Sequence, residues 1–240
     1  MAGMDPRLII ALDYPEAGPA LALAERVEDY CRFFKVGLEL YLAEGNELIH
    51  ELRHRGYSVF LDLKLHDIPN TVASAIATAA DTGATMLTVH ALGGPNMLAA
   101  AVDAAEKIQR APLLLAVTVL TSMDAEQLAA VGIDRTPAQQ VQQLAATAYG
   151  AGIRGFVCSP QETANLRNYF PSATLVVPGI RPAGADTGDQ KRVANPAAAI
   201  AAGADYLVVG RPITRAVDPV EAARAMIAEM HDSIPVPEAD

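Results

Sequence analysis

The amino-acid sequence predicts an α/β fold, a single (β/α)8 TIM barrel that occupies residues 1–240 as one domain. Eight short runs of β-branched or apolar residues recur along the chain, and the stretches between them are rich in alanine and helical in character. Such an alternation of strands and helices requires a parallel sheet. No linker, charge block or low-complexity segment separates the units, which favours one closed barrel over a doubly wound sheet of about five to seven strands.

The expected strands follow one another along the whole chain. They cover residues 8–12, 33–36, 59–63, 86–89, 113–118, 156–158, 175–177 and 206–209. Proline or glycine at several boundaries marks the helices between them. The expected helices include residues 46–55, 72–82, 96–109, 137–150, 162–169, 196–202 and 219–230.

Two long segments interrupt this regular alternation. They are residues 121–136, after the fifth strand, and residues 179–195, after the seventh, which contain Gly179, Gly184 and Gly188. Loops of this length are often functional, and in an α/β barrel the loops that follow strands form the active-site face. We therefore expect the second segment to be a lid that closes over a substrate. The tail, residues 233–240, is expected to be frayed.

Composition and charge exclude several classes of function. The formal net charge of −10 and the pI near 4.9 argue against a nucleic-acid partner, which needs clustered Lys and Arg. The two cysteines, Cys31 and Cys158, lie far apart, which fits a reducing cytoplasm better than a disulfide framework. Residues 1–7 do not resemble the start of a signal peptide, and the most apolar run, residues 111–120, is too short to span a membrane. We expect a soluble, cytoplasmic protein.

Charged residues gather at the ends of the first three expected strands. Alternation along the third strand places Asp62 and Lys64 on one face, while the intervening leucines take the other. The inward face of a barrel is normally apolar, so these charges indicate a polar site at the mouth. Lys35 ends the second strand and Asp13 ends the first. The alternative is a structural ion-pair network that only closes the top of the barrel.

An alternating set of lysines and aspartates suits a particular chemistry. Opposite charges within several ångströms favour the charged forms of both groups. The site therefore holds an acid, the ammonium, beside fixed negative charge. It suits a reaction that forms a carbanion next to a lysine while an anionic group departs near the aspartates.

A second group of residues follows the last two strands. Gly179 and Arg181 follow the seventh strand, and Gly210 and Arg211 follow the eighth. Loops seven and eight of such barrels commonly bind phosphate through glycine-exposed N–H groups and a guanidinium. Either arginine could instead be a solvated loop residue.

A metal site is a weaker interpretation of the same strand ends. His66 and His90 could hold a metal together with Asp62, but their spacing matches no familiar site and neighbouring lysines repel cations. We therefore predict no metal and no other cofactor.

Several short motifs occur in order along nearly the whole chain. They are Ala11-Leu12-Asp13, Phe34-Lys35-Val36-Gly37, Asp62-x-Lys64-x-x-Asp67-Ile68-Pro69-Asn70-Thr71, Val119-Leu120-Thr121-Ser122, Pro178-Gly179-Ile180-Arg181 and Val209-Gly210-Arg211. In this series the chain resembles the orotidine 5'-phosphate decarboxylase family of bacterial type, and the third motif is highly specific. The resemblance implies cofactor-independent conversion of orotidine 5'-phosphate to uridine 5'-phosphate and CO2, the last step of de novo pyrimidine biosynthesis.

The resemblance also implies a homodimer with shared active sites. In such a dimer Lys35, Asp62 and Lys64 of one chain join Asp67 of the other. The exchange of Asp67 between subunits follows from the resemblance alone. The residues that would also reach across the interface are Ile68 and Thr71.

The same resemblance implies a role for each site residue. Lys64 would protonate C6 of the pyrimidine, Asp62 and Asp67 would crowd the substrate carboxylate, and Lys35 with Asp13 would hold the ribose. Thr121 or its neighbour Ser122 would contact the edge of the pyrimidine. The expected phosphate ligands are Gln190, Arg211 and the Gly210 backbone, with Arg181 nearby.

Two rival functions remain. A related barrel that acts on sugar phosphates would share the Asp-x-Lys-x-x-Asp motif, but those enzymes use magnesium and carry an acidic ligand where this chain has Lys35. Insensitivity to a chelator separates them. A catalytically silent barrel that binds a phosphate ligand is the other rival, and it would have no need for four charged residues in so costly a cluster.

Overall fold

Eight parallel strands form a closed barrel in the order β1 to β8, with β8 paired to β1, in a computed structural model that describes residues 3–182 and 193–232. The predicted (β/α)8 fold is therefore confirmed. The strands are β1 (Leu8–Ala11), β2 (Phe33–Gly37), β3 (Ser58–Leu65), β4 (Met86–His90), β5 (Leu113–Val117), β6 (Gly155–Val157), β7 (Thr174–Val177) and β8 (Tyr206–Val209).

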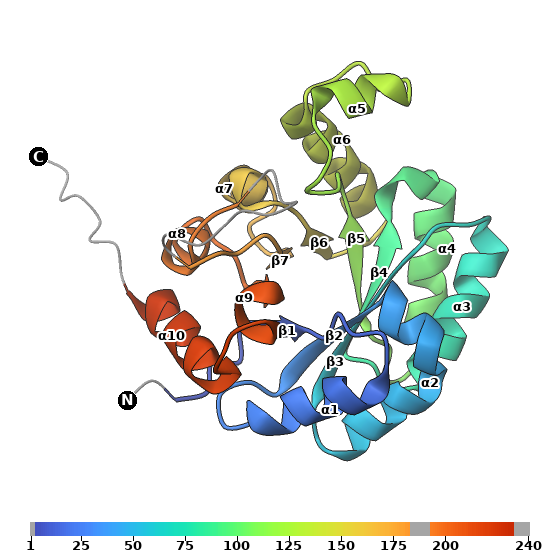
Figure 1. Cartoon of the computed structure of the whole chain (residues 1–240). Coiled ribbons are helices and arrows are strands. Elements are labelled where there is room, and N and C mark those ends of the chain that lie inside the picture. The colour runs from blue at the N-terminus through green and yellow to red at the C-terminus, as the bar shows by residue number, and fades with distance from the viewer. Residues whose placement is uncertain (1–2, 183–192, 233–240) are drawn as a thin grey trace, which may run out of the picture.

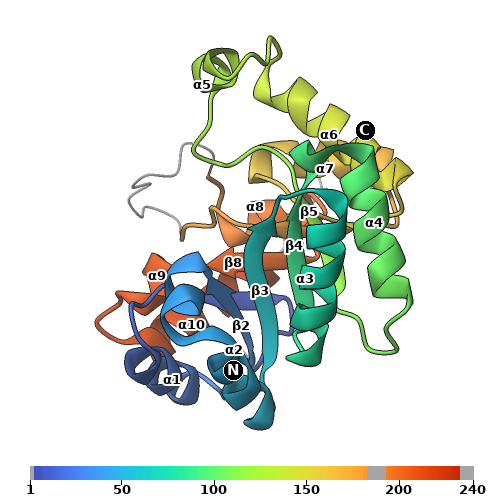
Figure 2. The same ribbon diagram turned by 90° about the vertical axis from the view of Figure 1, so that its right-hand side faces the viewer.

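Helices surround this ring of strands (Figure 1). They are α1 (Ala17–Arg26), α2 (Leu38–His54), α3 (Pro69–Asp81), the 3-10 turn η1 (Ala91–Gly93), α4 (Gly94–Glu106), α5 (Ala125–Ala130), α6 (Pro137–Gly150), α7 (Pro160–Tyr169), α8 (Pro196–Ala201), α9 (Arg211–Thr214) and α10 (Pro219–His231). Helices α3 and α4 pack side by side over β3 and β4 (Figure 2). Among the described residues, no helix combines the length and the apolar character needed to cross a membrane.

Several element boundaries differ from the prediction. The second helix begins at Leu38 instead of residue 46, because two helical segments join across Gly45, whose φ of 64° only glycine adopts freely. Within the predicted loop 121–136 lies α5, whose first turn is capped by Asp124, which accepts a hydrogen bond from the Gln127 N–H. Helix α1, of ten residues, and helix α9, of four, were not among the expected helices. The tail and most of the expected lid fall on residues 233–240 and 183–192, outside the described residues.

The core has two layers. A large outer layer lies between the strands and the helices. A smaller inner layer fills the barrel and consists of Ile9, Ala11, Phe33, Phe60, Met86, Leu115, Val176 and Val208. Because side chains alternate along a strand, the residue two positions after each of these also faces the barrel axis. At the C-terminal ends of the first three strands those next positions are Asp13, Lys35 and Asp62.

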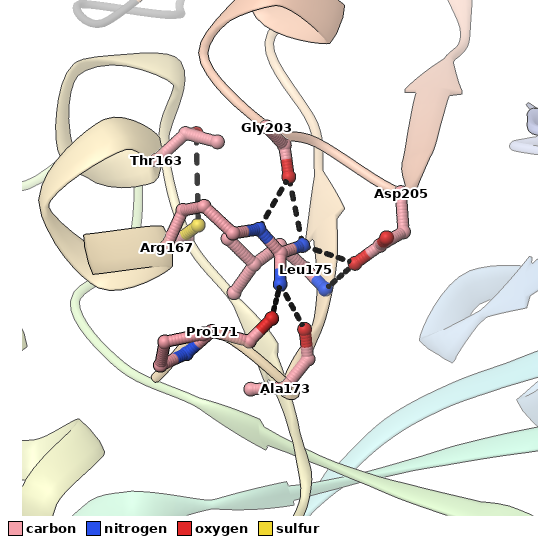
Figure 3. A network of polar contacts seen from close by, with 8 residues as sticks. Thr163, Arg167, Pro171, Ala173, Leu175, Gly203 and Asp205 are labelled. Carbon is pink, nitrogen blue, oxygen red and sulfur yellow. Dashed lines mark hydrogen bonds and ion pairs between the residues drawn. The ribbon is translucent and has the colours of Figure 1, made fainter. Parts of the chain in front are cut away.

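At the opposite, N-terminal end of the barrel, one arginine makes a network of polar contacts (Figure 3). Arg167 of α7 donates hydrogen bonds to the carbonyls of Pro171, Ala173 and Gly203, at 2.7 to 3.2 Å. It also pairs with the Asp205 carboxylate at 2.6 Å, and the same carboxylate accepts the Leu175 N–H at 2.7 Å. The network joins α7 to the segments that lead into β7 and β8.

Candidate active site

A pocket of about 450 Å³ opens at the C-terminal ends of the strands. It brings together most of the residues that the sequence indicated, from both ends of the chain. Those that line it are Asp13, Lys35, Asp62, Lys64, Thr121, Arg181, Gly210 and Arg211. Inward-facing side chains of β5, β6 and β8, such as Val117, Val157 and Val208, give the pocket an apolar floor.

Four charged side chains form an alternating row across one side of this pocket. The Lys35 Nζ lies 3.1 Å from Asp13 Oδ1 and 3.7 Å from Asp62 Oδ2. The Lys64 Nζ lies 2.8 Å from Asp62 Oδ1. Asp62 therefore stands between two ammonium groups, each facing a different carboxylate oxygen.

Asp62 and Lys35 lie deepest in the row, with side chains that are each 13% exposed, against 32% for Lys64. Burial alone would raise the pKa of the Asp62 carboxyl. The charges of Lys35 and Lys64, together with hydrogen bonds from Lys64 and Thr88, outweigh burial and hold that pKa below its ordinary value. Asp62 is thus a fixed negative charge at neutral pH.

The backbone at Lys64 adopts an uncommon conformation. Its φ is 50°, and no other non-glycine residue of the described chain has a positive φ. The pairing of β3 with β4 shifts register between Leu61 and Leu65, and the Lys64 N–H donates to the Thr88 hydroxyl at 2.8 Å. Strain of this kind gathers at functional sites.

Three predicted residues lie outside the pocket of their own chain. Asp67, Ile68 and Thr71 are exposed where β3 leads into α3, and none of them lines the pocket. The Asp67 carboxylate accepts the Ile68 N–H at 2.6 Å, and the Ile68 side chain is 67% exposed. The structure therefore leaves these three residues available to another molecule.

The two arginines line the pocket after β7 and β8. Arg181 donates from Nη1 to the Ile180 carbonyl at 2.8 Å, and its backbone N–H bonds to the Ala194 carbonyl. Arg211 is the first residue of α9, directly after Gly210. Gln190 lies outside the described residues. Thr121 lines the pocket, whereas Ser122 is absent from its described lining.

The model of the orotidine 5'-phosphate decarboxylase / HUMPS family matches residues 6–226. The chain belongs to this family. An orotidine 5'-phosphate decarboxylase of Halorhodospira halophila is 52% identical over 226 residues, which cover 94% of this chain and 96% of the relative. The relative of the same name from Alkalilimnicola ehrlichii is 54% identical, with 93% and 96% covered.

Solved structures of the same fold agree with this family assignment. The crystal structure of orotidine 5'-phosphate decarboxylase from Lactobacillus acidophilus superposes with a TM-score of 0.82 at 37% identity, covering 95% of this chain and all of that one. An uncharacterized conserved protein from Geobacillus kaustophilus gives a TM-score of 0.81 at 36% identity, with 93% and 99% covered.

The two histidines that the sequence offered as metal ligands, His66 and His90, lie next to each other at the C-terminal end of the barrel. Their rings stack with centroids 5.4 Å apart. Burial, with the charges of His66 and Lys64, lowers the pKa of His90 to about 4, and its Nδ1 accepts the Leu92 N–H. Within residues 3–182 and 193–232, no group of three His, Cys, Asp or Glu side chains is arranged to hold a metal ion.

Sequence reasoning missed Thr88. The residue is fully buried in β4, and its hydroxyl lies 3.1 Å from Asp62 Oδ1. A signal was present, because Thr88 stands two positions after the inward-facing Met86 and must share its face. A buried threonine in this register is a polar residue next to the charged row.

Proposed function

We propose that this protein catalyses the cofactor-independent decarboxylation of orotidine 5'-phosphate to uridine 5'-phosphate and CO2, the last step of de novo pyrimidine biosynthesis. The observation that carries the proposal is the row of Asp13, Lys35, Asp62 and Lys64 in one pocket that Arg181 and Arg211 also line. Family membership supports the same reaction. Cys31 and Cys158 are both buried and are not joined to each other in a disulfide, which fits a reducing cytoplasm.

Lys64 is the proton donor in this proposal. When the bond from C6 to the carboxylate breaks, its electron pair stays on C6 and CO2 leaves. The Lys64 ammonium, held 2.8 Å from Asp62, stabilises that charge and transfers one proton to C6. The pyrimidine offers no evident electron sink for this carbanion, so a fixed cation at C6 is the main means of lowering the barrier.

Asp62 supplies the fixed negative charge beside the departing group. Its lowered pKa keeps it ionised, so it repels the substrate carboxylate in the bound state. That repulsion is relieved as CO2 forms. In this proposal Asp67 of a partner chain adds a second carboxylate, while Lys35 and Asp13 hold the ribose.

The phosphate of the substrate would lie at the part of the pocket formed by the segments that follow β7 and β8. Arg211, the Gly210 N–H and Gln190 would bind it, with Arg181 nearby, and Thr121 would contact the pyrimidine edge. A guanidinium matches phosphate oxygens in geometry and charge. Binding energy gained at this remote group is expressed in the transition state at C6.

A homodimer with shared active sites completes the proposal. Asp67, Ile68 and Thr71 are exposed, do not line the pocket of their own chain, and would enter the pocket of the partner. Exposed apolar side chains also gather after β2, β3 and β4, where a partner would cover them. They are Leu38 at 50%, Leu42 at 79%, Ile68 at 67% and Leu92 at 47% exposed.

One assay tests both the reaction and the proton donor. Orotidine 5'-phosphate is added to the purified protein in the presence of a chelator, and the loss of ultraviolet absorbance is followed. We expect rapid turnover by the wild type and a loss of about 10⁴-fold in Lys64→Ala. No turnover by the intact protein would instead favour the magnesium-dependent sugar-phosphate barrels.

A second experiment tests the shared sites. Lys64→Ala and Asp67→Ala chains are each nearly inactive alone. When the two are co-expressed, a mixed dimer has one site with both changes and one site with neither. We expect activity to return in the mixture, and a mixture as inactive as its components would refute the exchange of Asp67.

A further inference from the structure

The hydroxyl of Thr88 makes two hydrogen bonds near the proposed proton donor Lys64. One is to the Lys64 backbone, and the other is to Asp62, the carboxylate that pairs with the Lys64 ammonium. Thr88 Oγ1 lies 2.8 Å from the Lys64 backbone nitrogen and 3.1 Å from Asp62 Oδ1. The side chain is 0% exposed, so water does not compete for these bonds. Of the four residues in the row, Asp62 and Lys64 are the two for which the described structure has a hydrogen bond to the Thr88 side chain of β4.

The direction of both hydrogen bonds is fixed by their chemistry. A backbone N–H can only donate, and an ionised carboxylate can only accept. The Thr88 hydroxyl therefore accepts from Lys64 and donates to Asp62, and it has no alternative arrangement that satisfies both. A buried hydroxyl bonded in this way orders the two groups that it joins.

The bond to Lys64 explains how an uncommon backbone conformation is held. At φ 50° the lysine leaves regular strand geometry, at the point where β3 and β4 shift register. Its N–H is satisfied by the Thr88 side chain at this irregularity. Without that acceptor, a buried N–H would lose its partner and the left-handed conformation would lose a support.

The bond to Asp62 fixes the rotation of the carboxylate. Oδ1 accepts both the Thr88 hydroxyl and the Lys64 ammonium at 2.8 Å, which leaves Oδ2 to face Lys35 at 3.7 Å. Rotation of this carboxylate would move the ammonium with it. Thr88 thus constrains Lys64 twice, through its backbone and through its side-chain partner.

We propose that Thr88 is a positioning residue that sets the Lys64 ammonium for proton transfer to C6. This inference rests on the proposed function. Thr88 is not among the residues that line the pocket, so it would act on Lys64 without contacting the substrate. It acts on the chemical step and leaves the affinity for the nucleotide almost unchanged.

The test compares Thr88→Val, which keeps the shape and removes the hydroxyl, with Thr88→Ser, which keeps the hydroxyl. In Thr88→Val we expect kcat for orotidine 5'-phosphate to fall about 10- to 100-fold, because small misplacements of a reacting group cost factors of this size. KM and the affinity for uridine 5'-phosphate should change little. Thr88→Ser should recover kcat to within a few-fold of the wild type.

Thr82→Val is the matched control. The Thr82 hydroxyl is also buried, accepts a backbone N–H from Ala84 and donates to the Ala79 carbonyl, but it lies at the C-terminus of α3, far from the pocket. We expect it to lower the Tm without lowering kcat. If Thr88→Val behaves like this control, or if Thr88→Ser does not recover kcat, the inference is wrong.

The pH profile gives a readout that a merely structural role would not move. The groups that face the Asp62 carboxyl are Lys35, Lys64 and Thr88. Loss of the Thr88 hydrogen bond raises the pKa of this carboxyl relative to the wild type, so the acid limb of kcat/KM should move to higher pH in Thr88→Val. An unmoved acid limb would contradict the role.

Two further measurements distinguish an unfolded variant, a wrong proposed function and a wrong role for Thr88. If Thr88→Val does not fold, Thr88→Cys keeps a similar volume with a weak hydrogen-bonding group, and its kcat must also fall for the proposal to stand. A wild type without turnover refutes the proposed function itself. A wild type with turnover and a Thr88 series without effect refutes only the role of Thr88.

Discussion

The two ends of the barrel use the same kind of ion pair in opposite ways. At the N-terminal end, Arg167 makes five hydrogen bonds with its five N–H groups, to three carbonyls and to Asp205. At the C-terminal end, the Lys64 ammonium has three N–H groups and makes one hydrogen bond to a described residue, Asp62. One cation is saturated by fixed partners, and the other keeps donors that face the pocket.

This difference distinguishes a structural ion pair from the one that we propose to be reactive. A saturated guanidinium stabilises the chain segments that it joins, but it has nothing left to offer a ligand. The lysines and aspartates of the mouth are held by each other in a pocket where a substrate can still reach them. Charges that are incompletely satisfied cost stability, and they persist where they serve function.

After the loss of Lys64 itself, the largest expected effect comes from neutralising one aspartate at each end. Asp62→Asn removes the charge between Lys35 and Lys64, and we expect kcat/KM to fall about 10³-fold. Asp205→Asn weakens the pair with Arg167 and should lower the Tm while kcat/KM stays unchanged. Steady-state kinetics and thermal unfolding of both variants check this pair of outcomes, and equal losses of activity would erase the distinction between the ends.

Removing Arg167 at the N-terminal end of the barrel should affect stability instead of catalysis. Arg167→Ala leaves the carbonyls of Pro171, Ala173 and Gly203 without their donor, and we expect a loss of about 3 kcal/mol in the free energy of unfolding. Arg224→Ala removes an exposed pair with Glu221 and should leave the free energy of unfolding nearly unchanged, because solvent screens exposed pairs. Urea unfolding measures both free energies. Similar losses in the two variants would contradict the idea that the fully hydrogen-bonded guanidinium of Arg167 stabilises the fold more than an exposed pair does.

The phosphate side of the pocket should show an intermediate effect on activity. Arg211→Ala removes the proposed phosphate contact, and we expect kcat/KM to fall about 100-fold, because hydrogen bonds to charged groups are among the strong ones. The affinity for uridine 5'-phosphate should fall with it. An Arg211→Ala variant with unchanged kcat/KM would remove this residue from the site.

A smaller effect is expected from crowding the row of charges. A Cβ at Gly37 would lie 2.9 Å from the Lys35 Nζ, so Gly37→Ala must displace that ammonium from between Asp13 and Asp62. We expect kcat/KM to fall about 10-fold with little change in Tm. Gly18→Ala in α1 meets nothing within 4 Å and is the control. Equal kinetics in the two variants would show that the position of Lys35 is not critical.

The smallest effect concerns pH and stability at the mouth. The pKa of His90 is lowered to about 4, below the value of about 6.5 expected in the unfolded chain. The unfolded chain therefore binds the proton more readily, and stability falls as the pH drops from about 6.5 towards 4. His90→Gln should show a shallower decline in Tm over this range, whereas exposed His50→Gln should follow the wild type.

Much of this site could be predicted from the sequence because strands alternate with a period of two. That period alone placed Asp62 with Lys64, and the barrel placed Asp13 and Lys35 beside them. The arginines of the last two loops were likewise expected at the mouth, where the structure has them. Asp67 was expected by resemblance to serve a partner, which remains a prediction.

The eight strands, and the shared face of Asp62 and Lys64 on the third of them, could be assigned from the sequence alone, since both depend on local patterns of apolar residues. Three features could be seen only in the tertiary structure: the left-handed backbone of Lys64, its bond to Thr88 and the approach of Gly37 to Lys35. These features depend on the register between neighbouring strands and on side-chain rotation. Both arise when strands distant in sequence close into one barrel, and no local pattern encodes them.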